Sequence, residues 1–312
     1  MKITRRSFVG GAVAFGAALQ AFAQDHRPTG DAKLDAVQRE INEVSPADFK
    51  AYCQSGAPLE SYVPQTGEPK FAALRRLDAA FRKVVDEIHA TKVAAGGPPA
   101  LWYVYNMGFL VKTPQAFFSV DLQHRFAEEL ALELDFALIT HNHNDHYTRR
   151  FYEAMNNRLH KTVVSNFADN YGAHFAKNPG GFTRGGKEFA FKDVHIKTSA
   201  SDHNSYLIDF TMPFEVTVGN FRFFHTGDSQ NIAKLNPADA PDIWMVHPYC
   251  GLNVADGVAK FHPKKTVIGH LNELGHAKNR WRFTYRDGRT QIAKVEAAGG
   301  VALMPLWGDR IV

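Results

Sequence analysis

The chain has 312 residues, of which 45% are hydrophobic, so it can bury one large core or two small ones. Its only two cysteines, Cys53 and Cys250, exclude a small disulfide scaffold, and the sequence leaves open whether the two thiols pair. The formal net charge is +4, but three basic residues stand in the first six positions, before any acidic one. The remainder is therefore near neutral and gives no indication of nucleic-acid binding.

The first 23 residues have the layout of a secretory signal peptide. The pair Arg5-Arg6 precedes an apolar stretch over residues 8–22, which is rich in glycine and alanine and ends at the small residues Ala21 and Ala23. A spanning helix needs about 20 apolar residues, so we expect cleavage near Ala23 rather than a retained anchor. The paired arginines resemble the bacterial twin-arginine signal. This implies transient contact with the twin-arginine translocation machinery, a periplasmic or secreted location and no stable membrane insertion after cleavage.

Residues 24–95 are predicted to form an N-terminal helical extension. We expect one helix over 33–43 and a stronger one over 71–92, where apolar residues recur at helical spacing. A cluster of glycine and proline over 95–99 ends the second helix. The extension is expected to cover the core of a catalytic domain over 96–312 without contacting substrate.

From residue 100 onward, short apolar runs typical of strands alternate with helical segments. Strands are expected over 101–111 and 116–120 (a hairpin), 136–140, 161–165, 188–191, 194–198, 206–211, 214–218, 221–225, 243–246 and 266–268. Helices are expected over 126–132, 148–158, 255–261 and 290–298. Two sets of strands with interleaved helices predict an α/β fold in which two sheets lie between layers of helices.

One short segment carries most of the chemistry. An apolar strand is followed by His141, His143, Asp145 and His146, three imidazoles and one carboxylate within six residues. Imidazoles two positions apart in extended chain project to the same side, so His141 and His143 can hold one cation. The turn that follows brings Asp145 and His146 toward a second position. These ligands suit zinc, and also iron or manganese, and their density favours a metal site over a polar surface loop.

The pattern His141-x-His143-x-Asp145-His146 after an apolar strand resembles the signature of the metallo-β-lactamase superfamily. The resemblance covers about residue 101 to the C-terminus and implies the metallo-β-lactamase fold, an αββα sandwich of two mixed sheets flanked by helices. It also implies a third histidine for the first cation, an aspartate that bridges two cations and a final histidine for the second.

Each implied ligand has a candidate in a loop that follows a predicted strand. His203 is the candidate for the third histidine, and Asp228, in a Gly-Asp turn, for the bridging aspartate. His270 is the candidate for the last ligand. His195 is the fallback for His203, although it lies inside a predicted strand. His276 competes with His270 and is interpreted as a residue that lines the pocket or supports a ligand.

Three other residues have open roles. His225 and His247 lie at or near strand ends and are candidates for supporting metal ligands through hydrogen bonds. Cys250 is a conceivable soft ligand, but Asp228 already fills the bridging role.

The resemblance implies a metal-dependent hydrolase that acts on a small-molecule substrate. Two divalent ions, with zinc as first choice and iron or manganese as alternatives, would hold a hydroxide that attacks an ester, lactone or phosphodiester-type bond. Asp145 would be the catalytic residue as well as a ligand, because it would also orient the nucleophile. Tyr147, Asn204 and Asn272 stand close to ligands in the sequence and are candidate hydrogen-bond donors to substrate.

Two other functions remain open at this point. The first is an iron-containing redox protein or oxygenase of the same fold, although two cysteines cannot form a four-thiolate iron site. The second is a metal-binding protein without catalysis. Neither the substrate nor the metal follows from the residues alone.

Overall fold

The computed structural model describes residues 27–61, 63, 66–165 and 186–312. The predicted signal peptide over residues 1–23 lies outside the described residues. Within those ranges, every helix is too short or too polar to cross a membrane.

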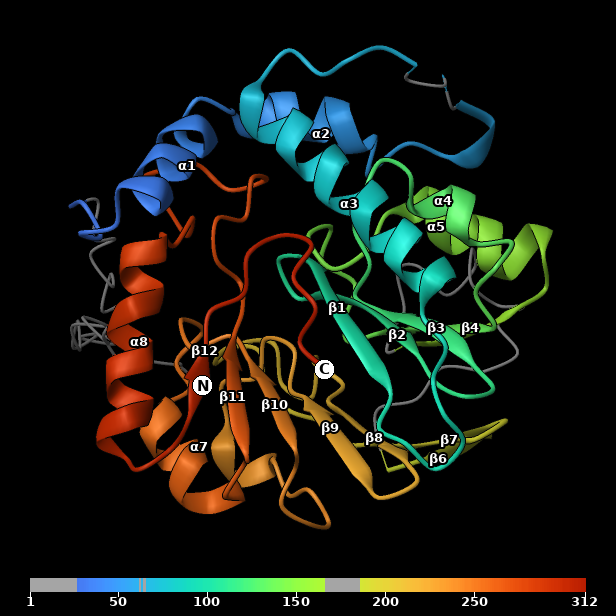
Figure 1. Cartoon of the computed structure of the whole chain (residues 1–312), viewed down its shortest axis with the longest axis vertical. Helices are drawn as coiled ribbons and strands as arrows, with labels where there is room; N and C mark the ends of the chain where they lie inside the picture. Colours follow the sequence, from blue (N-terminus) through green and yellow to red (C-terminus); the bar gives the residue numbers. More distant parts are fainter. Residues whose placement is uncertain (1–26, 62, 64–65, 166–185) are drawn as a thin grey trace, which may run out of the picture.

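Two mixed sheets form the centre of the molecule (Figure 1). The first sheet contains, in hydrogen-bonded order, β1 (Ala100–Tyr105), β2 (Gly108–Lys112), β3 (Phe117–Val120), β4 (Phe136–Ile139) and β5 (Thr162–Ser165). Strands β1 to β3 are antiparallel, whereas β3, β4 and β5 are parallel. The C-terminal residues cover the edge of β1, where Ile311 N donates to Leu101 O at 2.8 Å.

The second sheet is larger and is also mixed. Its strands, in hydrogen-bonded order, are β12 (Ala302–Leu303), β11 (Lys265–Ile268), β10 (Ile243–Val246), β9 (Phe221–His225), β8 (Phe214–Val218), β7 (Val194–Thr198) and β6 (Glu188–Phe191). Strands β9 to β12 run parallel, and β6 to β9 are joined as antiparallel neighbours. Because β7 and β9 are both antiparallel to β8, the carboxyl ends of β7, β9, β10 and β11 lie on the same edge of this sheet.

Helices cover the outer faces of both sheets (Figure 1). They are α1 (Ala32–Asn42), α2 (Pro46–Cys53), α3 (Ala72–Ala90), α4 (Ala127–Leu130), α5 (Arg149–Glu153), α7 (Val254–Phe261) and α8 (Tyr285–Ala297), with shorter turns at Leu59–Ser61, Ala154–Arg158 and Ile232–Lys234. Helix α3 packs on β1 and on α1, while α8 packs on α7, β11 and β12. The expected arrangement of two mixed sheets between helices is confirmed.

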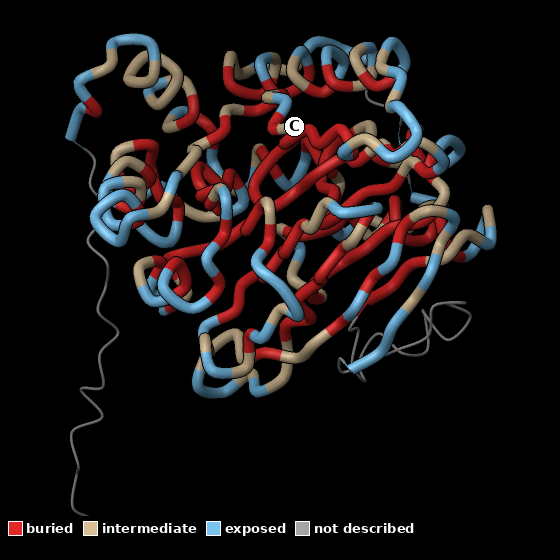
Figure 2. The backbone as a smooth tube through the Cα atoms, turned by 60° about the horizontal axis from the view of Figure 1, so that its bottom comes forward, coloured by how far each residue is buried: buried red, intermediate tan, exposed pale blue. Residues whose placement is uncertain are grey.

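The core follows from the spacing of apolar residues. In α3, Leu74, Leu77, Phe81, Val84 and Ile88 recur every three or four residues and are all buried. Figure 2 shows that buried positions follow the strands of both sheets, whereas exposed positions gather on helix surfaces and loops. The packed interior therefore lies in and between the sheets.

The structure corrects four predicted elements. The expected strand over 101–111 is two strands, because Asn106 adopts a left-handed φ of +56° and turns the chain between β1 and β2. The region 148–158 is α-helical only to Glu153 and continues as a π-helix. Helix α8 begins before residue 290, because Thr284 and Asp287 form a capping box. Helix α2, which was not among the predicted elements, begins at a similar capping box that Ser45 forms with Asp48.

The fourth correction concerns residues 206–211, which were expected to form a strand. They belong to an irregular loop whose only pairing is an isolated bridge between Ser201 and Thr211. Lys234 binds the carboxylates of Asp202 at 2.6 Å and Asp209 at 2.7 Å, and these contacts hold the two sides of the loop in place of a strand ladder.

The two cysteines are both unpaired. Cys53 is buried in α2, and Cys250 lies in the loop after β10. The pairing left open by the sequence does not form in this structure.

Candidate metal centre

The seven predicted ligands come from loops that follow strands. His141, His143, Asp145 and His146 follow β4 of the first sheet. The other three follow strands of the second sheet that point the same way: His203 after β7, Asp228 after β9 and His270 after β11. Parallel orientation therefore gathers the three at one edge of the second sheet, and the structure brings all seven together.

The first cluster consists of His141, His143 and His203. One nitrogen from each of these side chains lies within 4.8 Å of the others, and the ring centroids are 4.6 to 5.2 Å apart. His141 is fully buried, whereas His143 and His203 are half-buried. Three imidazole nitrogens with this spacing can hold one divalent cation.

The second cluster consists of Asp145, His146, Asp228 and His270. One ligand atom from each lies within 4.8 Å of the others. Asp145 Oδ2 is 2.9 Å from His270 Nε2 and 3.7 Å from His146 Nε2. All but Asp145 are buried. This group can hold a second cation with both nitrogen and oxygen ligands.

Asp228 lies between the two clusters. Its carboxylate is 3.9 Å from His141 Nε2 and 3.5 Å from His203 Nε2 in the first cluster. It is 3.2 Å from His146 Nε2 and 3.6 Å from His270 Nε2 in the second. This is the position that a bridging carboxylate requires.

The turn that carries Asp228 depends on a glycine. Gly227 has a left-handed φ of +52°, and a Cβ atom there would lie 2.8 Å from side-chain carbons of Thr140 and Thr211. A larger residue would push the turn away from the end of β4, and with it the Asp228 carboxylate.

Asp121, which the sequence analysis did not single out, supports both the strand end and a predicted ligand. It follows β3 and is fully buried. Its carboxylate accepts hydrogen bonds from Thr140 N and Thr140 Oγ1, each at 2.7 Å, and contacts His146 Nδ1 at 2.8 Å. Thr140 Oγ1 also contacts His141 Nδ1 at 3.0 Å. These contacts turn the Nε2 atoms of both histidines toward the clusters.

Charge differs between the two clusters. Burial lowers the pKa of His143 to about 4, and it also lowers the pKa of His141 well below the usual range. Burial alone would lower the pKa of His146 as well, but the carboxylates of Asp228, Asp145 and Asp121 raise that pKa well above its usual range. A proton therefore sits on His146 where a cation would otherwise balance the carboxylates.

Other histidines considered from the sequence lie around the clusters. His247 stacks on His270, with ring centroids 3.7 Å apart. His225 is buried and contacts Met107 O through Nε2 at 2.8 Å. His195 is exposed on β7, near Glu188, and belongs to neither cluster. The fallback for His203 is therefore not needed.

Cys250 is not a member of either cluster. Its thiol donates to Ser229 O at 3.1 Å, and burial raises its pKa well above the usual range. It is therefore protonated and hydrogen-bonded, which agrees with Asp228 filling the bridging position.

Glu273 and His276 form a pair beside the second cluster. Glu273 is fully buried, and its carboxylate accepts from Gly275 N at 2.7 Å and Tyr105 Oη at 3.1 Å. Its other oxygen is 2.8 Å from His276 Nδ1. One ligand atom each of Asp145, Glu273 and His276 lie within 4.8 Å of one another. His276 was expected near the site, but Glu273 was not predicted, because a glutamate three residues past a ligand gives no sign of its burial.

The three candidate hydrogen-bond donors to substrate, Tyr147, Asn204 and Asn272, differ in their burial and in the contacts that they make. Asn272 is buried, and its Oδ1 accepts from Gln38 Nε2 of α1 at 2.8 Å. Asn204 caps its own loop, where Oδ1 accepts from Tyr206 N at 2.9 Å. Tyr147 is buried. Of these candidates, Asn272 and Tyr147 are therefore not exposed beside the clusters.

The N-terminal extension is tied to the loop that follows His270. Arg282 is buried and donates to five backbone oxygens. Two lie at the end of α1 (Ile41 O at 3.1 Å and Val44 O at 2.8 Å), and three lie in the loop, on Glu273, Leu274 and His276. The extension therefore does more than cover the core, because it fixes the segment that carries Glu273 and His276.

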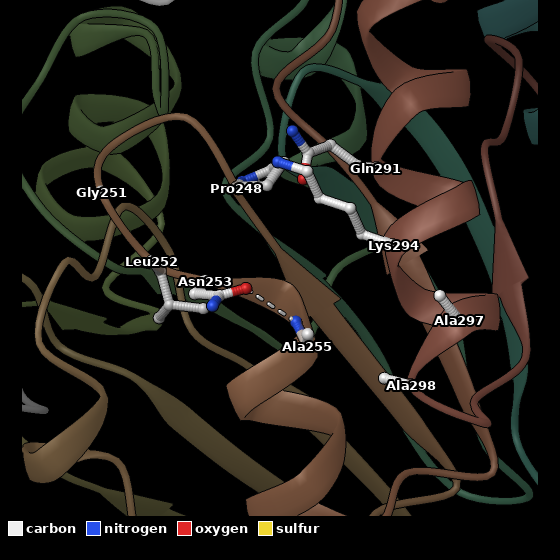
Figure 3. A pocket seen from close by; sticks show the side chains of 9 residues that line it. All are labelled: Pro248, Gly251, Leu252, Asn253, Ala255, Gln291, Lys294, Ala297 and Ala298. Carbon is white, nitrogen blue, oxygen red and sulfur yellow. Dashed lines mark hydrogen bonds between the residues drawn. The ribbon is translucent and has the colours of Figure 1, made fainter. Parts of the chain in front are cut away.

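A separate pocket of about 590 Å³ lies between α7 and α8 (Figure 3). Asn253, which caps α7 by accepting from Ala255 N at 3.1 Å, lines one side, and Gln291 and Lys294 of α8 line the other. None of its lining residues belongs to either cluster. We therefore base no chemistry on this pocket.

Comparison with solved structures identifies the fold. The metallo hydrolase Igni18 from the hyperthermophilic archaeon Ignicoccus hospitalis matches with a TM-score of 0.54 and 18% identity, over 68% of this chain and 97% of Igni18. The metallo-beta-lactamase fold protein YhfI from Bacillus subtilis matches with a TM-score of 0.51 and 13% identity, over 68% of this chain and 99% of YhfI.

CmlA, a diiron beta-hydroxylase from Streptomyces venezuelae, matches with a TM-score of 0.54 and 14% identity, over 71% of this chain and 54% of CmlA. The match thus spans about half the length of CmlA. No protein-family model matches the sequence, and no curated protein matches it.

These similarities establish the architecture. The chain has the metallo-β-lactamase fold, as the motif around His141 predicted. About a third of the chain has no counterpart in Igni18 or YhfI.

Proposed function

We propose that this protein is a hydrolase that uses two divalent cations, one held by each cluster and both bound to Asp228. The observation that carries this proposal is the position of Asp228, whose carboxylate lies within 4 Å of histidines from both clusters. A single carboxylate shared by two groups of ligands is the arrangement that a two-metal hydrolytic site needs.

The residues fit cations on a second ground. His141 Nε2 and His203 Nε2 are buried and make no hydrogen bond within the described part of the chain. Buried nitrogens without partners are rare, because each costs free energy that a hydrogen bond or a metal would recover. Zinc is the first choice for the three imidazoles of the first cluster, and the carboxylates of the second also suit iron or manganese.

The bound cations would supply a water of lowered pKa as nucleophile and would stabilise negative charge on the substrate oxygen. The chain's own residues would do the rest. Asp145, the least buried member of the second cluster, would bind a cation and accept a hydrogen bond from the nucleophile. His276, oriented by Glu273, would donate a hydrogen bond to the substrate. Esters, lactones and phosphodiesters are the compounds whose bonds such a nucleophile would hydrolyse.

Iron chemistry is the second candidate. The carboxylates of Asp145 and Glu273 lie close to His276 at the edge of the second cluster. CmlA, which has the same fold, is a diiron beta-hydroxylase. Carboxylate-rich sites favour iron over zinc. A protein that is purified with two equivalents of iron and hydrolyses nothing would support this candidate.

We also propose that the protein is exported. The paired arginines, the apolar stretch and the small residues before residue 24 support cleavage near Ala23 and a periplasmic or secreted location. Mass spectrometry of the protein recovered from its host tests this. A mature chain that still begins at Met1 would contradict the proposal.

The test of the hydrolase proposal combines metal analysis with a substrate panel. The purified protein should contain two equivalents of metal and hydrolyse at least one of three chromogenic compounds: a carboxylic ester, a lactone or a phosphodiester. His143→Ala should lose metal and activity together while it stays folded by circular dichroism. His195→Ala, an exposed histidine on β7, is the matched control and should keep both.

A further inference from the structure

Exposed apolar side chains gather on the two loops that flank the clusters. Six large apolar side chains are exposed in the described part of the chain, and three of them lie on these loops. Tyr206 (86% exposed) and Ile208 (58%) follow His203, and Trp281 (48%) lies in the loop after His270. Large apolar groups gathered at a protein surface mark binding sites more often than chance.

The first loop is held in a fixed shape. Lys234 joins Asp202 and Asp209 from the two sides of the loop. Ser201 and Thr211 close its base through hydrogen bonds of 2.8 and 3.0 Å. The two carboxylates of the loop are therefore both bound to Lys234, and the loop presents Tyr206 and Ile208 to solvent.

Phe210 extends this apolar surface onto the first cluster. Its ring centroid is 5.1 Å from that of His143, 5.6 Å from that of His141 and 6.0 Å from that of His203. The same loop that carries the exposed Tyr206 and Ile208 therefore also places an aromatic ring against the first cluster.

The second loop presents Trp281 beside the second cluster. The Trp281 ring meets His276 edge to face at 5.8 Å, and the Arg280 guanidinium lies 4.5 Å from the ring centroid. Trp281 has a left-handed φ of +66°, which is strained for a bulky residue. The bonds of Arg282 to the backbone of this loop hold Trp281 in that conformation. Strain that is maintained by buried contacts points to function rather than to an accident of the surface.

We propose that the substrate is a carboxylic ester or lactone with apolar substituents, which lie against Phe210, Tyr206 and Ile208 at the first cluster and against Trp281 at the second. This inference rests on the proposed function, because it places the reacting carbonyl at the cations. Apolar surface gains free energy by burying alkyl or aromatic groups. A phosphodiester anion would instead rely on charged hydrogen-bond donors, whereas the Arg280 guanidinium beside the second cluster stacks on the Trp281 ring.

The test is a series of p-nitrophenyl esters of increasing acyl length (acetate, butyrate and hexanoate) with bis(p-nitrophenyl) phosphate for comparison. For the metal-loaded protein, kcat/KM should rise by about fourfold per methylene while the chain remains in contact with the loops, mainly through KM. The phosphodiester should be the poorest substrate.

Variants assign the effect to the loops. Ile208→Ala and Trp281→Ala should flatten the series by raising KM for hexanoate, with metal content and melting temperature unchanged. Leu132→Ala is the matched control, because it removes the same number of carbon atoms as Ile208→Ala from a side chain that is 67% exposed. Leu132 precedes β4, whereas His141 follows it, so the control lies at the opposite end of that strand. A flat series in the unmodified protein, or equal loss in Leu132→Ala, would overturn the inference.

A binding measurement separates this inference from the hydrolase proposal. If no ester, lactone or phosphodiester is cleaved, the hydrolase proposal fails, but calorimetry with acetate and hexanoate on the metal-loaded protein still decides the inference. Tighter binding of hexanoate that depends on Ile208 and Trp281 supports it, and equal affinity overturns it. The inference would also be overturned if kcat/KM did not change with acyl length and Trp281→Ala abolished self-association of the protein. The exposed apolar side chains would then form an interface between copies of the chain.

Discussion

The two clusters contain different kinds of ligand side chain. The first contains three imidazoles, two of them half-buried, and its nitrogens have few hydrogen bonds to other groups. The second contains two carboxylates and two imidazoles, is mostly buried, and is backed by Asp121 on one side and by Glu273 on the other. The first cluster therefore contains only imidazoles and is partly exposed, whereas the second contains carboxylates and is supported by buried residues around it.

This difference indicates what each cluster needs. The second cluster contains two carboxylates, and these raise the pKa of His146, so a proton on His146 offsets part of their charge when no cation is bound. The first needs no such compensation, since burial keeps His141 and His143 neutral near pH 7. Cation binding should therefore be coupled to protons and to surrounding residues at the second cluster much more than at the first. The predictions below test this contrast.

The largest effect should come from Asp228, the one residue that both clusters share. Asp228→Asn removes the charge that both cations would contact, so kcat/KM should fall by at least about a thousandfold. Metal analysis should show weaker binding at both clusters. Asp239→Asn, which changes an exposed carboxylate paired with Arg222, is the control and should have no effect. Full activity in Asp228→Asn would remove the basis of the two-cation proposal.

Asp121→Asn should separate the two clusters. Its carboxylate orients His146 but contacts no residue of the first cluster except through Thr140. The affinity for the second cation should fall about 10- to 100-fold, with a much smaller change for the first. Competition titration with a chromogenic chelator measures both. Equal losses at the two clusters would contradict the contrast.

The pH dependence of metal binding should differ in the same way. The pKa of His146 is raised, so near pH 7 a cation at the second cluster must displace a proton, and its affinity should fall by about tenfold for each pH unit below that pKa. The pKa of His143 is about 4 and that of His141 is also lowered, so both are already neutral at pH 6, and neither should make first-cluster affinity depend on pH from 6 to 8.

Calorimetry in buffers of different ionisation enthalpy counts the protons directly. More protons released per cation at the second cluster than at the first is the expected result, because the pKa of His146 is raised and those of His141 and His143 are lowered. The reverse assignment would show that the charge balance described above is wrong.

The smallest effect should come from Arg282→Lys. Lysine cannot reach all five backbone oxygens that the guanidinium contacts, so the free energy of unfolding should fall by about 2 kcal/mol. Second-cluster affinity should fall severalfold, because the loop after His270 loses its tie to α1, while first-cluster affinity stays the same. Arg280→Lys, an exposed neighbour, is the control. A purely structural role would lower the melting temperature and leave both affinities unchanged.

The candidate ligands could be predicted because the motif at His141 resembles that of a family whose other ligands follow strands. His203, Asp228 and His270 share that context with the motif at His141, and parallel strands bring such positions together. Asp121 also follows a strand, so the same rule could have found it. Aspartates at strand ends serve many purposes, however, so this rule cannot single out Asp121 until the fold shows that it contacts His146.

The remaining features depend on contacts between distant parts of the chain. Gln38 and Asn272 are separated by 234 positions, and no local pattern indicates that they meet. The burial of Glu273 likewise depends on Tyr105 of β1 and on the folded loop. The segment 206–211 was predicted to be a strand because a short apolar run is typical of a buried strand, but Tyr206 and Ile208 of this run are exposed.

The central claim is that two cations share Asp228, and anomalous X-ray diffraction from crystals of the metal-loaded protein tests it most directly. We predict two anomalous peaks about 3.5–4 Å apart, one on each side of the Asp228 carboxylate. A single peak, or a second peak among Asp145, Glu273 and His276 with none between His146 and His270, would contradict the account.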